Sequence, residues 1–222
     1  MRISVIIPCF NHAQYLPEAI ESVLDQSRKA DEIVVISDGS TDNSLEIANK
    51  YPVKVINQVN KGLPSARNTG IMNATGDYIF PLDADDILLP ECLEKIEQAA
   101  EENNYPDVIA PSFKQFGVSN YDFIFNGIPS LSEFKTANRL PYFCAIKREV
   151  LLEVGGYNPK MKLGYEDYDL WFDIFKRKHS LCLIQEKLVL YRTKENSMLT
   201  ESNKHKDELM AQIRTNHPEL WS

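Results

Sequence analysis

The chain has 222 residues, of which 43% are hydrophobic and 25% are charged, a composition typical of a folded protein with a sizeable core rather than of a disordered chain. The 24 basic and 32 acidic side chains give a formal net charge of −8, which argues against non-specific binding to nucleic acid. Phosphate ligands are not excluded, because a metal ion can supply positive charge.

The cysteines lie far apart without a CxxC pair, and no HExxH motif or Cys/His cluster is present, so a structural zinc site is not expected. We interpret the cysteines as reduced residues in or near the core. The apolar start MRISVII could begin a signal peptide, but Pro8 and the polar residues after it end the run too early. No stretch approaches the roughly 20 apolar residues that span a bilayer. We therefore expect a soluble, cytoplasmic protein without a transmembrane segment, with at most a peripheral place at the inner face of the membrane.

Short apolar runs alternate with amphipathic stretches through the first half of the chain. Continuous β-branched runs predict strands covered on both faces, at 3–7, 33–36, 53–56 and 78–82. Apolar spacing, with Pro17 and Asp42 near helix starts, predicts intervening helices at 16–24, 42–48, 64–73 and 93–100. This order predicts an α/β fold with a mostly parallel central sheet flanked by helices.

After residue 105 the regularity weakens, and the segment 107–147 mixes short β-like runs with glycine and proline. The later pattern predicts helices at 148–154, ended by Gly155-Gly156, and at 166–178, strand-like runs at 181–184 and 188–192, and a polar helix to the terminus. Without repeats or a clear linker, we expect one domain over 1–222, divided into 1–105, 106–195 and a C-terminal helical tail at 196–222.

The strongest chemical signal is the run Leu82-Asp83-Ala84-Asp85-Asp86 at the end of the fourth predicted strand. Three carboxylates within four residues repel one another unless positive charge lies among them. The carboxyl ends of strands in open α/β sheets are common ligand sites, and magnesium binds one or two protein carboxylates together with phosphates and water. An acidic turn capping the helix near Pro90 is an equally weighted alternative.

Two further segments follow the first two predicted strands. In Ser37-Asp38-Gly39-Ser40-Thr41-Asp42, Asp38 could accept hydrogen bonds from a nucleobase or a ribose hydroxyl, whereas a plain turn and helix cap is the alternative. In Pro8-Cys9-Phe10-Asn11, the ring of Phe10 could stack on a base, whereas a buried phenylalanine is the alternative.

The last two segments carry a cation and an acidic pair. Arg67, on the helix that precedes the acidic strand, is placed to meet a phosphate or a base, unless it is an ordinary surface arginine. Glu166 and Asp167 open a later helix, where acidic residues are favoured by the helix dipole alone. The functional interpretation is that one of them acts as a general base on an acceptor hydroxyl.

Taken in order, the segments PCFN, SDGSTD, GLPSARNTGI, GDYIFPLDADD and GGYNPKMKLGYEDYDLW resemble those of family 2 glycosyltransferases of the GT-A fold. The resemblance covers about residues 2–192. It implies an inverting, metal-dependent transfer of sugar from a nucleotide-diphosphate sugar to a glycan or lipid-linked saccharide. UDP is expected because it predominates in the family, while dTDP and GDP stay open. The 1–105 half would bind the nucleotide sugar, and 106–195 would form the acceptor side.

The resemblance also implies roles for individual side chains. Residues that would contact the donor are Pro8, Phe10 and Asn11 at the nucleoside, Asp38 at the base edge, Arg67 beside the base and diphosphate, and Asp83, Ala84 and Asp85 of the DxD motif. Asp85 would be the direct ligand of Mg²⁺ or Mn²⁺, and Asp83 would lie nearer the ribose and be the second metal residue. Asp167 matches the catalytic base, and Glu166 and Trp171 would shape the acceptor side.

Two departures from the family pattern bear on the activity. Many relatives have a histidine two residues after the Tyr191-Arg192 pair, whereas this chain has Lys194, which while charged cannot ligate a metal but can contact the diphosphate. The QxxRW motif of processive synthases does not follow the acidic pair, so transfer of a single sugar is expected.

Two alternatives belong to other classes of protein. A non-catalytic nucleotide-sugar-binding module is disfavoured by the intact Glu166-Asp167 pair. A sugar nucleotidyltransferase is disfavoured because PCFNHAQY lacks the glycine-rich basic loop usual after the first strand of that class.

Overall fold

The β-branched runs of the first half become adjacent parallel strands in the computed structural model, which describes residues 1–221. They lie in the order β3-β2-β1-β4, and their bounds are Ile3–Cys9 for β1, Glu32–Asp38 for β2, Lys54–Gln58 for β3 and Tyr78–Pro81 for β4. All seven residues of β1 are buried, as expected for a central strand covered on both faces. The predicted strands are therefore confirmed to within about two residues at each end.

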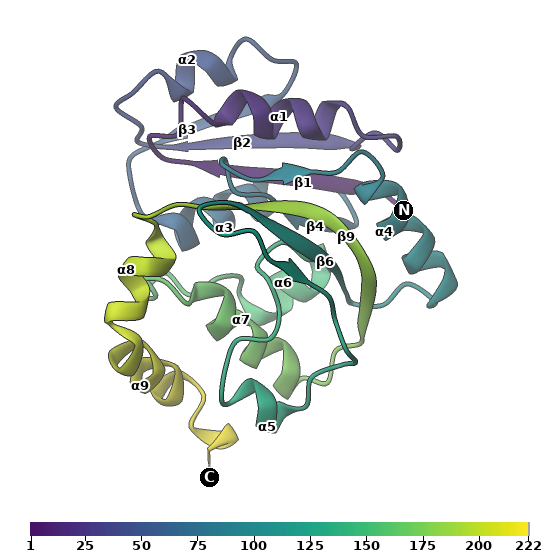
Figure 1. Cartoon of the computed structure of the whole chain (residues 1–222), viewed down its shortest axis with the longest axis vertical. Coiled ribbons are helices and arrows are strands. Elements are labelled where there is room, and N and C mark those ends of the chain that lie inside the picture. The colour runs from purple at the N-terminus through teal and green to yellow at the C-terminus, as the bar shows by residue number, and fades with distance from the viewer. Residues whose placement is uncertain (222) are drawn as a thin grey trace.

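The helices of the first half cover both faces of this sheet (Figure 1). Their bounds are Leu16–Leu24 for α1, Ser44–Ala48 for α2, Leu63–Asn73 for α3 and Cys92–Glu102 for α4. Alternate residues of β1 point to opposite faces, so Val5 and Ile7 pack with α1 and α4, while Ile6 packs with α3. The result is a three-layer arrangement in which loops at the strand ends are free to build a site.

The second half of the chain extends the same sheet on the β4 side, in the order β4-β8-β6-β9-β5. The strands on this side are β5 Ile87–Leu88, which comes from the first half of the chain, and β6 Val108–Gly117, β7 Asp122–Phe123, β8 Ala145–Lys147 and β9 Leu181–Thr193 from the second. The antiparallel pairings span two residue pairs each, whereas β6 and β9 run parallel along the whole of β6. The predicted mostly parallel α/β sheet is therefore confirmed, with short antiparallel contacts joining its two halves.

The helices of the second half pack beneath the same face as α3. They are α5 Leu131–Phe134, α6 Arg148–Val154 and α7 Glu166–Lys176. The predicted end of α6 is confirmed, because Gly155 adopts the left-handed conformation at φ 85° that glycine tolerates best.

Two elements differ from the sequence prediction. The runs 181–184 and 188–192 form one strand, because β9 stays paired with β6 through an irregularity that leaves Gln185 and Glu186 exposed. The C-terminal stretch is divided into α8 Met198–Lys204, α9 Lys206–Asn216 and the short helix η1 Pro218–Leu220.

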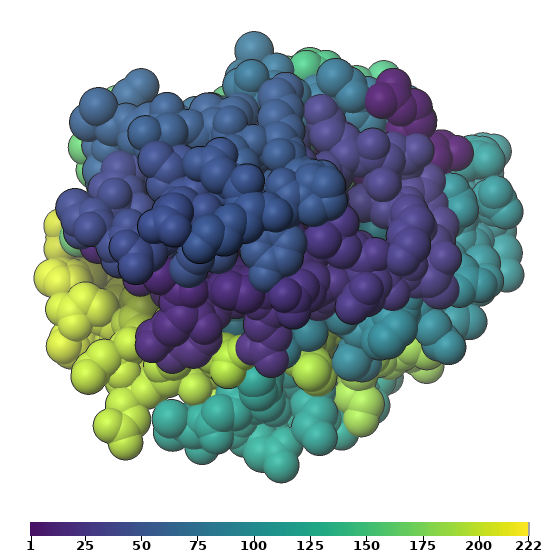
Figure 2. Space-filling view, turned by 90° about the horizontal axis from the view of Figure 1, so that it is seen from above, coloured from purple at the N-terminus to yellow at the C-terminus, as the bar shows by residue number. Residues whose placement is uncertain are grey.

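The C-terminal tail is tied to the body of the domain. His217 is buried, and its Nε2 lies 3.0 Å from Oδ1 of Asp169 on α7. Seen from above, residues near the C-terminus (yellow) adjoin N-terminal residues (purple) along one edge of the molecule (Figure 2). Among the described residues, no helix has both the length and the apolar character needed to cross a membrane.

Candidate functional site

Two cavities adjoin at the carboxyl ends of β1, β2 and β4. The larger cavity encloses about 500 Å³ and reaches from the end of β1 to residues 194–199. The smaller cavity encloses about 270 Å³ and lies against the start of α7. Both are lined by Leu63, Asp83, Tyr191, Met198 and Leu199, so a molecule in one could touch a molecule in the other.

Most of the residues predicted to contact a nucleotide sugar lie in the wall of the larger cavity. They are Pro8, Phe10, Asp38, Asp83, Ala84, Asp85 and Lys194. Phe10 is 45% exposed, so it is not the buried core residue of the alternative interpretation. An exposed ring in the wall of this cavity is available for stacking on a planar ligand.

Asp38 lines this cavity, but its carboxylate is already engaged by the chain. Its Oδ1 accepts hydrogen bonds from Nε2 of Gln58 at 2.7 Å and from the amide of Lys61 at 3.0 Å, and its Oδ2 accepts one from the amide of Gly62 at 2.9 Å. Asp38 therefore positions the loop that leads into α3. One of the roughly four acceptor sites of the carboxylate is left for a ligand.

Asn11 is placed differently from the prediction, because it does not line either cavity. At φ 53° it turns the chain sharply after β1, and its Oδ1 accepts hydrogen bonds from the amides of Thr41 and Asp42. The asparagine thus joins the loops after β1 and β2, and it supports the cavity wall without forming it.

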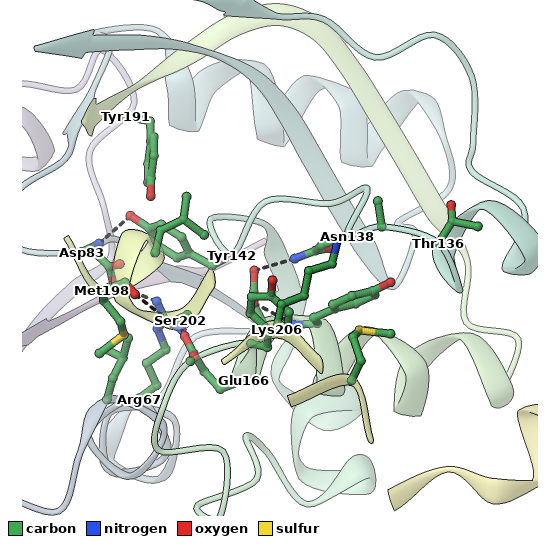
Figure 3. A pocket seen from close by; sticks show the side chains of 18 residues that line it. Arg67, Asp83, Thr136, Asn138, Tyr142, Glu166, Tyr191, Met198, Ser202 and Lys206 are labelled. Carbon is green, nitrogen blue, oxygen red and sulfur yellow. Dashed lines mark hydrogen bonds and ion pairs between the residues drawn. The ribbon is translucent and has the colours of Figure 1, made fainter. Parts of the chain in front are cut away.

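Arg67 is also placed differently, since it is only 1% exposed and lines the smaller cavity. Its Nη1 donates to Oε1 of Glu166 at 2.6 Å, and its Nη2 donates to Oδ1 of Asp83 at 2.8 Å (Figure 3). The guanidinium lies 4.6 Å from the ring centre of Tyr142 and 5.1 Å from that of Tyr157.

Burial alone would lower the pKa of Arg67, but the charges of Asp83 and Glu166 outweigh burial and raise that pKa well above its usual value. Arg67 therefore stays charged. It links Asp83, which lines both cavities, to Glu166, which lines only the smaller one.

The third carboxylate of the acidic run, Asp86, is buried and fixes the loop that carries the other two. Tyr142 Oη donates to Oδ2 of Asp86 at 2.5 Å and accepts from the amide of Asp83 at 2.9 Å. Oδ1 of Asp86 accepts from the amide of Arg192 at 2.7 Å. Burial first, and then the charges of Asp85 and Asp83, raise the pKa of Asp86 well above its usual value. The acidic loop is thus held against the end of β9 by hydrogen bonds.

The two carboxylates predicted to bind a divalent metal are each paired with a cation of the protein. Asp83 Oδ1 is bonded to Arg67, and Asp85 Oδ2 lies 2.6 Å from Nζ of Lys194 and 3.8 Å from Nε2 of His12. Within residues 1–221, no three His, Cys, Asp or Glu side chains group as metal ligands would. The donor set therefore does not fit a resident divalent ion unless Lys194 is displaced from Asp85.

Glu166 and Asp167 are delivered to the smaller cavity by a tight turn. Gly164 at φ 115° and Tyr165 at φ 61° both lie in the left-handed region just before α7 begins at Glu166. A non-glycine residue in this region is uncommon and is typical of functional turns. The turn places both carboxylates at the amino end of the helix, where its dipole favours negative charge.

Asp167 is a suitable proton acceptor in this position. Its Oδ2 accepts from Nδ2 of Asn138 at 2.9 Å, and its Oδ1 accepts from the amide of Tyr168 at 2.8 Å. Burial first, and then the charge of Glu166, raise the pKa of Asp167 to about 7, although Arg67 opposes that rise. A carboxyl with a pKa near neutrality takes and returns a proton readily.

Trp171, which was predicted to shape the acceptor side, is fully buried in the core and lines neither cavity. Sequence reasoning missed Asn138, Tyr142 and Tyr157, which hold Asp167, the acidic loop and Arg67. Asn138 and Tyr142 come from the segment that gave no periodic signal, and Tyr157 lies in the turn after α6.

Comparison with known proteins identifies the class of this molecule. Its fold is that of the GT-A type transferase TarS of S. aureus, which was solved as residues 1–349 in complex with UDP-GlcNAc. The two share a TM-score of 0.75 and 20% identity, over 98% of this chain and 72% of that one. The complex of TarS with UDP gives a TM-score of 0.69 at 19% identity.

The chain belongs to glycosyl transferase family 2, whose model matches residues 4–155. It is 31% identical to the glycosyltransferase GlyG of Streptococcus pneumoniae, over 89% of this chain and 72% of GlyG. It is 32% identical to EpsE of Bacillus subtilis, over 88% of this chain and 74% of EpsE. The protein is therefore a glycosyltransferase.

Proposed function

We propose that the protein transfers a single sugar, with inversion, from a UDP-sugar to a hydroxyl of a glycan or lipid-linked saccharide. The observation that carries this proposal is the junction of the cavities. Asp83 lies in the wall of both, and Asp167, with a pKa of about 7, lies in the wall of the smaller one. A donor in the larger cavity would then present its sugar to an acceptor that lies beside Asp167.

The choice of a UDP-sugar is supported by the lining of the larger cavity and by the fold. Pro8 and the exposed ring of Phe10 offer an apolar surface for a base, and Asp38 keeps one acceptor site for a base or ribose donor. The structural neighbour TarS was solved both with UDP and with UDP-GlcNAc. The acceptor would bind in the smaller cavity, where Tyr165, Tyr168 and Met210 form a surface suited to a sugar ring.

The proposed reaction is a direct displacement. A carboxylate oxygen of Asp167 takes the proton of the acceptor hydroxyl, whose oxygen forms the new bond to the anomeric carbon. The bond between that carbon and the diphosphate oxygen breaks, and the diphosphate leaves with the electron pair. Asn138 holds Asp167 in place, and the positive charge of Arg67, which donates to Glu166 beside it, limits the repulsion between the two carboxylates.

Water in place of the acceptor allows a test before the natural acceptor is known. With UDP-glucose, whose sugar is α-linked, proton NMR should show β-glucose as the first hydrolysis product. Initial release of α-glucose would contradict inversion. In a parallel thermal-shift comparison, UDP should raise the melting temperature more than dTDP or GDP, and a larger shift with GDP would contradict the assignment of the base.

A further inference from the structure

Lys194 lies in the larger cavity at the position where a metal ion would be expected beside Asp85. Its Nζ is 2.6 Å from Oδ2 of Asp85 and 3.2 Å from Nε2 of His12, and it lies 5.1 Å above the ring of Tyr15. The side chain is 25% exposed, so solvent or a ligand in the cavity can reach the ammonium. The ammonium of Lys194 therefore contacts a carboxylate, an imidazole and an aromatic ring at the same time, unlike that of a freely solvated surface lysine.

The backbone that carries Lys194 is fixed to the acidic loop. Two residues earlier, the amide of Arg192 donates to Asp86, and Nε of Arg192 donates to the carbonyl oxygen of Asp85 at 2.8 Å. The guanidinium of Arg192 lies 4.7 Å from the ring centre of Tyr15 and 4.4 Å from that of Phe116, and it also pairs with Glu18. These contacts hold the end of β9 against the loop that carries Asp85, and they place Lys194 beside the Asp85 carboxylate.

We infer that the ammonium of Lys194 replaces a divalent cation as the group that neutralises the donor diphosphate, so that the donor binds without a metal. This inference rests on the proposed function. An ammonium has three N–H donors, and the contacts with Asp85 and His12 use two of them when Nε2 of the histidine is an acceptor. The third is left for a phosphate oxygen. A divalent ion on Asp85 would meet the charge of Lys194 at close range, and like charges there repel.

Isothermal titration of UDP tests this directly, with the protein in EDTA and again in excess Mn²⁺. The wild-type affinity should be the same in both solutions to within about twofold. Lys194→Ala should weaken binding about tenfold or more in EDTA, because the compensating charge is lost. Lys194→His should bind UDP weakly in EDTA and recover with Mn²⁺, because a neutral imidazole can ligate a metal beside Asp85. Lys187→Ala, on β9 but outside both cavities, should behave as wild type.

The outcomes separate this inference from the proposed function. If wild-type protein binds UDP only when Mn²⁺ is present, or if Lys194→Ala binds UDP as tightly as wild type in EDTA, Lys194 does not take the role of the metal, although UDP is still a ligand. If wild-type protein binds UDP in neither solution, both this inference and the assignment of a UDP-sugar donor are wrong.

Discussion

The two cavities hold their charges in different ways. In the larger cavity, Asp85 and Lys194 form an ion pair whose side chains are 15% and 25% exposed. In the smaller cavity, Arg67 is 1% exposed and is enclosed by Glu166, Asp83 and aromatic rings. An ion pair that solvent reaches can exchange partners at little cost, whereas a buried network has one arrangement. The comparison suggests that the larger cavity is suited to take up and release an anion, and the smaller one to hold the protonation state of a base.

The largest effect is expected from Asp167→Asn. The amide cannot accept the proton, so hydrolysis of the UDP-sugar should fall by about 10² to 10⁴. UDP affinity should be unchanged, because Asp167 lines only the smaller cavity. Initial rates and calorimetry measure the two quantities separately.

The matched control is Asp173→Asn on the same helix, since Asp173 pairs with Lys176 and Arg177 and lines neither cavity. It should retain wild-type rates. Substantial hydrolysis by Asp167→Asn would show that another group is the base.

Arg67→Met should destabilise the protein by about 3–5 kcal/mol, because it leaves Glu166 and Asp83 without their buried partner. Lys194→Ala should cost about 1 kcal/mol or less, because its ion pair is partly solvated. Urea unfolding of the two variants measures this difference. Equal losses of unfolding free energy in the two variants would contradict the expectation that the buried ion pairs of Arg67 stabilise the protein more than the partly solvated pair of Lys194.

The pH dependence follows from the pKa of Asp167, which is about 7 in the folded protein and about 3.9 in an unfolded chain. Because the base must be ionised, the hydrolysis rate should fall about tenfold for each pH unit below 7. Between these two pKa values the folded state binds more protons than the unfolded state, so this group lowers stability as pH rises from about 4 to 7. Asp167→Asn should remove that part of the slope, and an unchanged slope would contradict the assigned pKa.

Gly164→Ala tests the contact between the turn that precedes α7 and the C-terminal tail. Gly164 has a φ of 115°, and an added Cβ would collide with Oγ of Ser202 on α8, which itself donates to the carbonyl oxygen of Leu163. The loss of stability should exceed about 1 kcal/mol, with a lower hydrolysis rate because α8 borders both cavities. Gly127→Ala has a similar φ of 91° but open space around it, so it should lose less stability. Equal thermal shifts would mean that α8 yields freely.

Most of the parallel strands could be predicted from the sequence because each has a local signal in its own residues. The runs around Val5 and Val34 are continuous and β-branched, and Pro17 marks the start of a helix. The segment 107–147 gave no such signal. Its long strand β6 contains Pro111 and pairs with β9 more than 70 residues later, so only the tertiary structure defines it.

The sequence pointed to residues that line a cavity, but it did not point to residues whose role is to position another side chain. Asp85, Asp167 and Lys194, which the sequence singles out, each line one of the two cavities. The sequence could not show that Tyr142, far along the chain, bridges Asp83 and Asp86. These supporting contacts depend on packing between distant segments, which no local pattern encodes.

The most direct test of the account is a crystal structure of the protein with UDP. We expect the nucleotide in the larger cavity, with the uracil against Phe10 and the diphosphate within hydrogen-bond distance of Lys194, pointing toward the cavity that contains Asp167. A nucleotide bound in the smaller cavity, or a diphosphate that leaves Lys194 without contact, would contradict it.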